Sequence, residues 1–228
     1  MSREGTAARR SQPLPSPRSA EVVRELGPFA GHDQVHGVSW DGTRVWAAVG
    51  DELIAVDPER GSIEQRIRVS AHAGTAFDGR YLYQIAESRI DRIDPATGEV
   101  VHSIAAPGNG ADSGLAWADG SLWVGRYRDR LIVQIDPETG AVLHTIHSDR
   151  FVTGVTWVDG ELWHGTIEDD TSELRRIDPS SGRVLERMAM PDGMLVSGLE
   201  SDGGELFFCG GARSGRLRAV KRTKGGKA

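Results

Sequence analysis

Five polar residues interrupt a pattern that otherwise repeats along this chain. His36, His72 and Asp112 each lie one or two residues before a recurring glycine, and Glu200 replaces a residue that is small in the other repeats. His164 lies near the same expected end of the fold. Imidazole titrates near neutral pH and can act as a general base, and imidazole with carboxylate suits Zn, Mn or Fe. These residue types therefore predict proton transfer or metal binding.

Two interpretations of these five residues remain open. In the first they converge on a substrate or a divalent metal, with His36 or His72 as the base and with Asp112 and Glu200 orienting it or binding the metal. In the second they are ordinary polar groups around a water-filled channel. No HExxH or CxxC spacing is present, so the identity and the presence of a metal stay undefined. The case for a site depends on where the fold places the five residues.

A phrase of the type DPxxG divides the chain into repeats. Its aspartates are residues 57, 94, 136 and 178, with steps of 37, 42 and 42 residues. A second phrase of the type G-x-x-aromatic, followed by a DG turn and another aromatic residue, precedes each copy and begins at Gly37, Gly74, Gly114 and Gly154. A fifth such phrase begins at Gly198 and keeps only the second aromatic residue, Phe207. A period near 40 residues is typical of propeller blades.

Each repeat contains four short segments rich in Val, Ile, Trp and Thr, which is a composition of β-strands. In the DG turns the glycine accepts a positive φ, and in DPxxG the Asp, Pro and Gly each suit one position of a tight turn. No segment has the extended 3.6-residue period of a helix, which disfavours a helical solenoid. The sequence therefore predicts blades of four antiparallel strands.

The fifth repeat has three of these segments and then ends. A segment of the missing type, residues 21–26 (EVVREL), occurs near the N-terminus. We therefore predict an all-β, five-bladed β-propeller whose last blade is closed by the N-terminal strand, which leaves no open joint. Residues 1–19 are expected to be a disordered leader, 20–222 a single propeller domain and 223–228 a flexible basic tail. Deleting residues 1–18 should then barely change the melting temperature, whereas deleting 1–28 should lower it strongly.

In a propeller the first strand of each blade lines the central channel, and loops at one mouth vary while the hairpins at the other do not. Function resides in variable loops on a rigid scaffold. Arg126, in GRYRDR, lies in such a loop and could hold an anionic substrate through its planar donor fork, although a solvated loop is the alternative. The tryptophans recur in register and are expected to pack between blades.

The bulk composition limits the partners. The formal net charge is −6, which argues against nucleic acid as the main partner. No run approaches the length of a membrane span, and the single cysteine, Cys209, suits a reducing compartment. We expect a cytoplasmic monomer with a small-molecule ligand, no nucleic-acid or membrane partner, and a protein partner as a further option.

The segments DGRYLYQIAESRIDRIDPATGEVV and DGELWHGTIEDDTSELRRIDPSSGRVL resemble repeats of the glutamine cyclotransferase family. This resemblance extends roughly over residues 20–220 and implies a five-bladed propeller that cyclises N-terminal glutamine. Gln84 matches a family LYQ segment, which implies substrate binding there. Ala47 stands where the family's acidic residue would be, and Thr153-Gly154 stands where the family has Asn-Glu. The phrase DGSLWVGRYRDRLIVQIDPETG also resembles repeats of streptogramin lyases, which are seven-bladed, metal-assisted enzymes.

Together these observations predict a small-molecule enzyme of lyase, cyclase or hydrolase type with a polar site at the channel mouth. Arg126, Gln84 and His164 would bind the substrate. A non-catalytic module that recognises a ligand or a protein on the same face is the alternative, because propellers serve both purposes.

Overall fold

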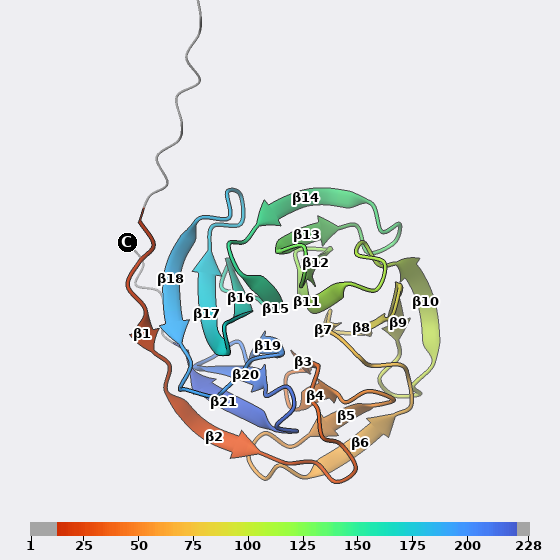
Figure 1. The fold of residues 1–228 in the computed structure, drawn as a ribbon. Helices are drawn as coiled ribbons and strands as arrows, with labels where there is room; N and C mark the ends of the chain where they lie inside the picture. Colours follow the sequence, from red (N-terminus) through yellow and green to blue (C-terminus); the bar gives the residue numbers. More distant parts are fainter. Residues whose placement is uncertain (1–12, 223–228) are drawn as a thin grey trace, which may run out of the picture.

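The chain folds into a ring of β-sheets around a central axis (Figure 1). The structure is a computed structural model that describes residues 13–222. All of its regular elements are strands, so the described part of the chain contains no helix that could cross a membrane. The predicted five-bladed propeller with four-stranded blades is confirmed.

The blades follow one another along the chain, and within each the strands run outward from the axis. Blade 1 contains β3 (Gly37–Trp40), β4 (Val45–Ala48), β5 (Leu53–Val56) and β6 (Ile63–Ile67). Blade 2 contains β7 (Thr75–Phe77), β8 (Leu82–Ala86), β9 (Arg89–Ile93) and β10 (Val100–Ala105). Blade 3 contains β11 (Asp112–Ala118), β12 (Ser121–Arg126), β13 (Leu131–Ile135) and β14 (Val142–His147). Blade 4 contains β15 (Phe151–Val158), β16 (Glu161–Glu168), β17 (Thr171–Ile177) and β18 (Val184–Ala189). Blade 5 contains β19 (Gly198–Ser201), β20 (Leu206–Gly210), β21 (Leu217–Lys221) and the N-terminal β2 (Val22–Leu26).

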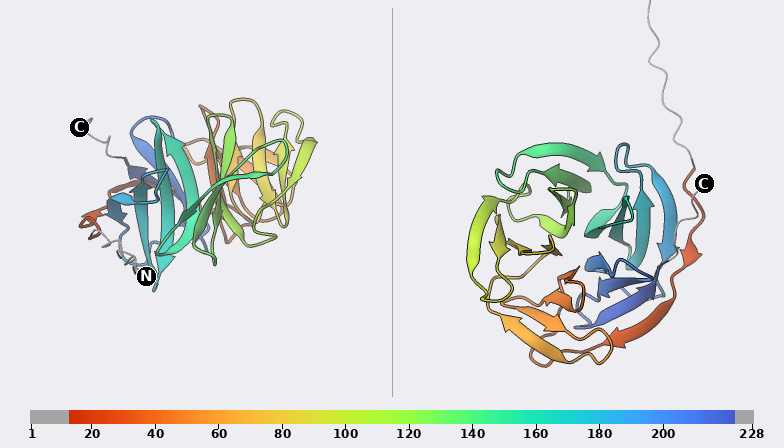
Figure 2. Two further views of the ribbon diagram at one scale, coloured as in Figure 1. Left: turned by 90° about the horizontal axis from the view of Figure 1, so that it is seen from above. Right: turned by 180° about the vertical axis from the view of Figure 1, so that it is seen from behind.

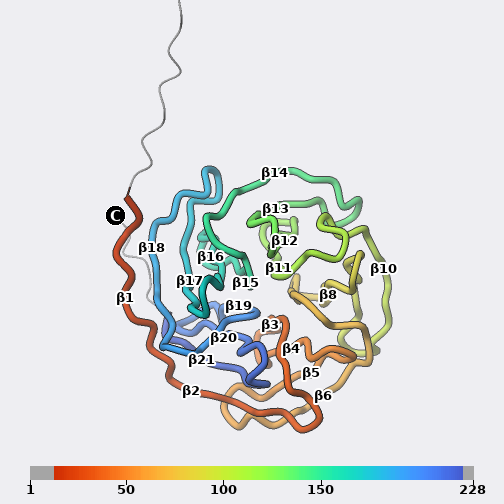
Figure 3. Tube along the Cα trace, viewed as in Figure 1, coloured from red at the N-terminus to blue at the C-terminus, as the bar shows by residue number. Residues whose placement is uncertain are grey.

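Blade 5 joins the two ends of the chain, as the missing repeat predicted. Strand β2 is antiparallel to β21, with Leu26 opposite Leu217. The red N-terminal segment and the blue C-terminal strand lie side by side in the tube view and from both sides of the ring (Figures 2 and 3). The edge that β21 would otherwise expose is therefore paired.

Blade 4 carries a fifth strand that the sequence did not predict. Strand β1 (Arg18–Ser19) runs parallel to β18 on its outer side, with Arg18 opposite Met188 and Ser19 opposite Ala189. The expected leader covered residues 1–19, so its last two residues belong to a sheet and not to a disordered segment. Residues 1–12 and the basic tail at 223–228 lie outside the described residues.

The core is divided among the blade interfaces. Five clusters of buried apolar side chains are present in the described chain, and each is shared by two neighbouring blades. Aromatic rings stack or tilt against one another across these interfaces, in the pairs Trp40–Phe208, Tyr83–Trp117, Trp123–Trp157 and Trp163–Phe207, with centroids 4.9 to 5.9 Å apart. This confirms that the recurring tryptophans pack between blades, where stacked rings add to the gain from burial.

The five recurring glycines form a ring where the first strands meet. A methyl group added to Gly37 would lie 2.8 Å from Gly74 Cα, and the same close approach continues through Gly114, Gly154 and Gly198 back to Gly37. None of these five glycines has a left-handed φ, so close packing of backbones explains the residue type. The glycine ring separates the two halves of the central channel.

Replacing Gly154 by Ala should destabilise the ring. The new methyl group would lie 2.3 Å from the backbone nitrogen of Leu199, which cannot move without shifting β19. We expect the free energy of unfolding to fall by about 3 kcal/mol, at the upper end of the usual cost of overpacking. Urea denaturation would measure this, with Gly204→Ala as the control because its nearest neighbour is the Asp202 side chain at 3.3 Å. Equal stability of the two variants would contradict a close-packed ring.

Candidate functional site

The first strands bring three of the predicted site residues to one mouth of the channel. His36 and His72 lie just before β3 and β7, and Asp112 is the first residue of β11. All three line a cavity of about 280 Å³ at the axis, on one side of the glycine ring. The other lining residues are Ala73, Ser113, Tyr127, Thr153, Ile167 and Ser197.

The two imidazoles lie edge to face. Their ring centroids are 5.9 Å apart with an angle of 72° between the planes. His36 is half-buried, whereas His72 is exposed. Burial and the neighbouring His72 lower the pKa of His36, and Asp33 opposes them. His36 is therefore neutral at pH 7 and able to accept a proton.

One carboxylate oxygen of Asp112 accepts a hydrogen bond, and the other has no partner within the described chain. The N–H of Gly108 donates to Oδ2 over 3.0 Å, while Oδ1 is buried and has no hydrogen-bond partner within the protein. Burial raises the pKa of Asp112 to about 6, against the N–H of Gly108 and the charge of Arg126. A methyl group on Gly108 would lie 2.5 Å from Oδ1, so only glycine leaves this space.

Thr153 provides a second unpartnered group in the same cavity. Its Oγ1 is buried and, within the described chain, accepts and donates no hydrogen bond. By contrast, the Ser113 hydroxyl donates to Val152 O at 2.8 Å, and the Ser197 hydroxyl donates to Val35 O. Buried polar groups in folded proteins are nearly always paired, and this cavity wall has two that find no partner within the described chain.

Arg126 lies beside the cavity but is not part of its lining. It is opposite Asp112 in the sheet, and its guanidinium pairs with Asp129 at 2.5 Å. The next residue, Tyr127, forms the wall and stacks on Phe151 with centroids 4.8 Å apart. The charge of Arg126 lowers the pKa of Asp112, but the side chain that lines the cavity is that of Tyr127.

Gln84 lies behind the cavity wall. It is completely buried, and its Nε2 donates to Ala73 O at 3.2 Å and to Ile85 O at 2.8 Å. Ala73 lines the cavity. Gln84 therefore supports the wall and does not line it, so it has no direct access to a ligand there.

Glu200 lies on the other side of the glycine ring. It follows Gly198 by two residues on β19, and its carboxylate accepts hydrogen bonds from the Thr156 hydroxyl and from Ser201 N at 2.8 Å. Burial raises its pKa to about 7 against these donors. The expected grouping of Glu200 with Asp112 is not found, because two residues of extended chain carry it past the constriction.

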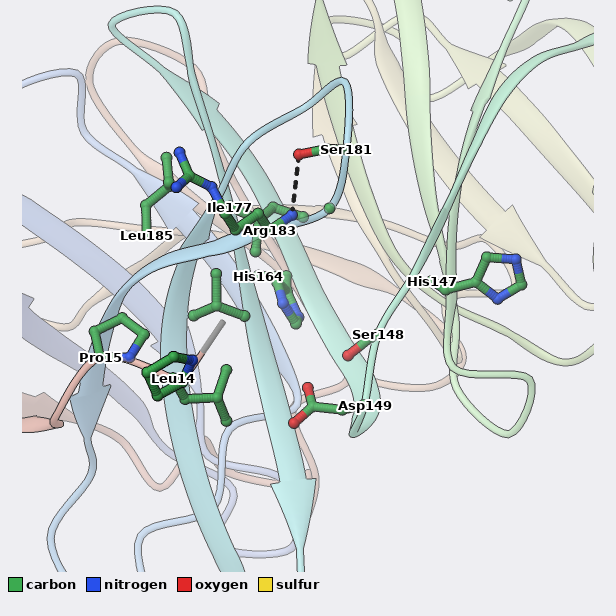
Figure 4. Close-up of a pocket in the computed structure, with 13 residues that line it drawn as sticks. Leu14, Pro15, His147, Ser148, Asp149, His164, Ile177, Ser181, Arg183 and Leu185 are labelled. Carbon is green, nitrogen blue, oxygen red and sulfur yellow. Dashed lines mark hydrogen bonds between the residues drawn. The ribbon is translucent and has the colours of Figure 1, made fainter. Parts of the chain in front are cut away.

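His164 is also separate from the mouth. It is buried in β16 and lines a larger cavity of about 990 Å³ on the side of the ring, between blades 3 and 4 (Figure 4). Burial, and then the charge of Arg175, lower its pKa to about 4. Second strands lie one step out from the axis, which is why a histidine in this strand faces a blade interface.

One signal in the sequence identifies four lining residues that were not predicted as site residues, Ala73, Ser113, Thr153 and Ser197. The residue directly before each recurring glycine is His36, Ala73, Ser113, Thr153 or Ser197. All five line the cavity. Among residues 13–222 no three His, Cys, Asp or Glu side chains gather closely enough to hold a metal ion, so the metal-assisted hypothesis finds no ligand set there.

Comparison with known proteins places the fold. No curated protein matches the chain. The crystal structure of Myxococcus xanthus glutaminyl cyclase is similar, with a TM-score of 0.75 and 17% identity over 92% of this chain and 98% of that chain. The WD40 β-propeller domain of Doa1 is similar with a TM-score of 0.52 and 16% identity over 82% of this chain and 63% of that chain. At these identities the likeness shows the fold alone.

A family model also matches the sequence. The model described as outer membrane protein assembly factor BamB matches residues 86–228, which is more than half of the chain. This chain has the fold of a five-bladed propeller and belongs to that family, PQQ_2.

Proposed function

We propose that this protein is a small-molecule enzyme of lyase, cyclase or hydrolase type, with its site in the mouth cavity. The observation that carries the proposal is the buried, unpartnered Oδ1 of Asp112. A second unpartnered group, Thr153 Oγ1, shares that cavity with His36 and His72. The similarity in fold to glutaminyl cyclase is consistent with an enzyme of this type.

Asp112 has the properties of a proton-transfer group. Gly108 holds one carboxylate oxygen in place, and Asp112 lines the cavity. A pKa of about 6 means that Asp112 is largely ionised at neutral pH, while its conjugate acid remains accessible. His36, neutral for the reasons above, could exchange a proton with the opposite end of a small substrate. Thr153 would orient a polar atom of that substrate.

The test compares the carboxyl groups of Asp112 and Glu200, which lie on opposite sides of the glycine ring. Turnover and thermal shift would be measured over a panel of small metabolites that includes peptides with N-terminal glutamine. For any substrate found, we expect Asp112→Asn to lower kcat/KM by about 10² to 10⁴. With Asp112 as the base, wild-type kcat/KM should fall as pH drops through about 6, and the Asn variant should lose this dependence. Glu200→Gln is the matched control. If the Glu200→Gln variant lost activity while Asp112→Asn kept it, the assignment of Asp112 as the proton-transfer group would be refuted.

A non-catalytic binding module is the second candidate, and one observation favours it. Ala47, where the resemblance to glutamine cyclotransferases implies an acidic residue, is a buried apolar side chain of β4. A metabolite that raises the melting temperature without being converted, and whose effect depends on Asp112 and Thr153, would support the binding module.

A further inference from the structure

Residues 13–20, which we call the strap, cross the outside of blade 4. Strand β1 lies within the strap and pairs in parallel with β18. The pairing is extended by Ala20 N, which donates to Ala189 O at 2.8 Å, and by an ion pair of 2.7 Å between Arg18 and Glu186. Blade 4 already has its own four strands, so the strap is an addition to a complete sheet.

The first part of the strap passes over the lateral cavity. Pro13, Leu14 and Pro15 form one side of this cavity of about 990 Å³ (Figure 4). Leu14 remains 47% exposed, so the strap covers the opening without filling the space behind it. The facing wall mixes apolar and polar residues, among them Ile177, Val184, Leu185, the buried His164 and the exposed Asp149.

A buried charge cluster holds the strap by its backbone. Arg187 Nη1 donates to Pro15 O at 3.1 Å, and Glu173 fixes Arg187 by accepting from its Nε at 3.0 Å. A carbonyl is present in any peptide, so this contact recognises an extended chain of any sequence. Proline suits this part of the strap because it loses no ladder hydrogen bond where no strand is formed.

Blade 4 differs from the other blades at this edge. Within the described chain, it is the blade whose outermost strand accepts a further strand. Glu186, which pairs with Arg18, corresponds by register to Gln65 in β6, His102 in β10 and His144 in β14. A carboxylate is thus found at this position of blade 4, where blades 1, 2 and 3 have Gln or His.

We propose that the lateral cavity and the outer edge of β18 form a docking groove for an extended peptide, which the strap occupies in cis. The peptide that fits this groove has an aliphatic residue between two prolines. These are followed by two residues in extended conformation, the first of which is an Arg that pairs with Glu186. Adding a strand to a sheet edge is a known mode of peptide recognition. Because a tethered segment acts at an effective concentration in the millimolar range, a free peptide competes poorly with the intact strap.

The test uses the full-length chain with its own strap disabled by Leu14→Asp and Arg18→Glu. The probe is a fluorescently labelled peptide of residues 13–20, and binding is followed by anisotropy. We expect the peptide to bind the disabled chain at least tenfold more tightly than the wild type. Adding Glu186→Arg to the disabled chain should abolish binding, and a peptide carrying Arg18→Glu should restore it.

Two outcomes would overturn the proposal. Equal affinity for wild type and disabled chain would mean that the strap does not occupy the binding site, and absence of binding to the disabled chain would mean that there is no groove for this sequence. Should the double variant lose cooperative melting, Arg18→Glu alone serves as the disabled chain, because Arg18 lies in β1, the edge strand of the sheet.

Discussion

Deleting residues 1–28 should lower the melting temperature by about 10 °C or more, whereas deleting residues 1–20 should lower it by only a few degrees. The longer deletion removes β2, and with it Leu26, which is 6% exposed and packs in the cluster shared by blades 1 and 5. Loss of a buried leucine alone costs about 2–5 kcal/mol, and a domain of this size loses about 2–4 °C per kcal/mol.

The same deletion would also open the ring. Strand β21 would lose its register partners, including Leu26 opposite Leu217, and Arg218 would lose its ion pair with Glu25. An unpaired strand edge favours association between chains. Thermal melting followed by circular dichroism, with size-exclusion chromatography, measures both effects. The shorter deletion removes the strap and keeps β2, so similar melting temperatures for the two truncated chains would show that β2 does not close the ring.

Glu173→Gln should lower the free energy of unfolding at neutral pH by about 3–5 kcal/mol, the usual cost of removing one partner from a buried ion pair. Glu173 is 5% exposed and faces three guanidinium groups, of which Arg175 is completely buried. The amide of glutamine keeps the shape but removes the buried carboxylate that pairs with Arg175, which then keeps only its pair with the exposed Asp149 among the ion pairs of the described chain. Glu138→Gln is the control, because Glu138 is exposed in its pair with Arg92 and should cost less than about 1 kcal/mol.

The pH dependence of this effect has a definite sign. Burial opposes ionisation of Glu173, but hydrogen bonds from Arg187 and Arg175 outweigh it and lower the pKa to about 2 from 4.5. Because the unfolded chain takes up the proton first, the contribution of Glu173 is complete above about pH 5 and is lost as pH falls toward about 2. The difference in stability between wild type and Glu173→Gln should therefore shrink over that range. Urea denaturation at several pH values measures it, and a constant difference would contradict the role of the carboxylate.

Much of the architecture was predictable because it depends on contacts that are local or repeated. The DPxxG turns illustrate this, since Asp57 Oδ1 accepts from the N–H groups of Glu59 and Arg60 at 2.8 Å within the turn. The aromatic residues recur in register, so their packing at one blade interface implies the same at the next. The absence of a fifth outer strand then indicated that the N-terminal segment closes blade 5, because the remaining strands left one position empty.

The mouth of the channel was predictable in part for the same reason. His36, His72 and Asp112 lie just before recurring glycines, and equivalent positions of a closed ring meet at its axis. Glu200 and His164 also interrupt the repeat, but interruption of a pattern says nothing of depth along the axis or distance from it. The glycine ring separates Glu200 from the cavity, and β16 places His164 at a blade interface.

By itself, then, the amino-acid sequence determined the number of blades, the order of strands, the turns and the place where the ring closes. Only the tertiary structure decided which polar atoms are left without partners and which edge accepts another strand. Asp112 Oδ1 and Thr153 Oγ1 have no hydrogen-bond partner within the described chain, and β1 exists because the outer edge of β18 lies beside it. Such properties depend on groups distant in the chain, whereas a repeat specifies only what its own residues form with one another.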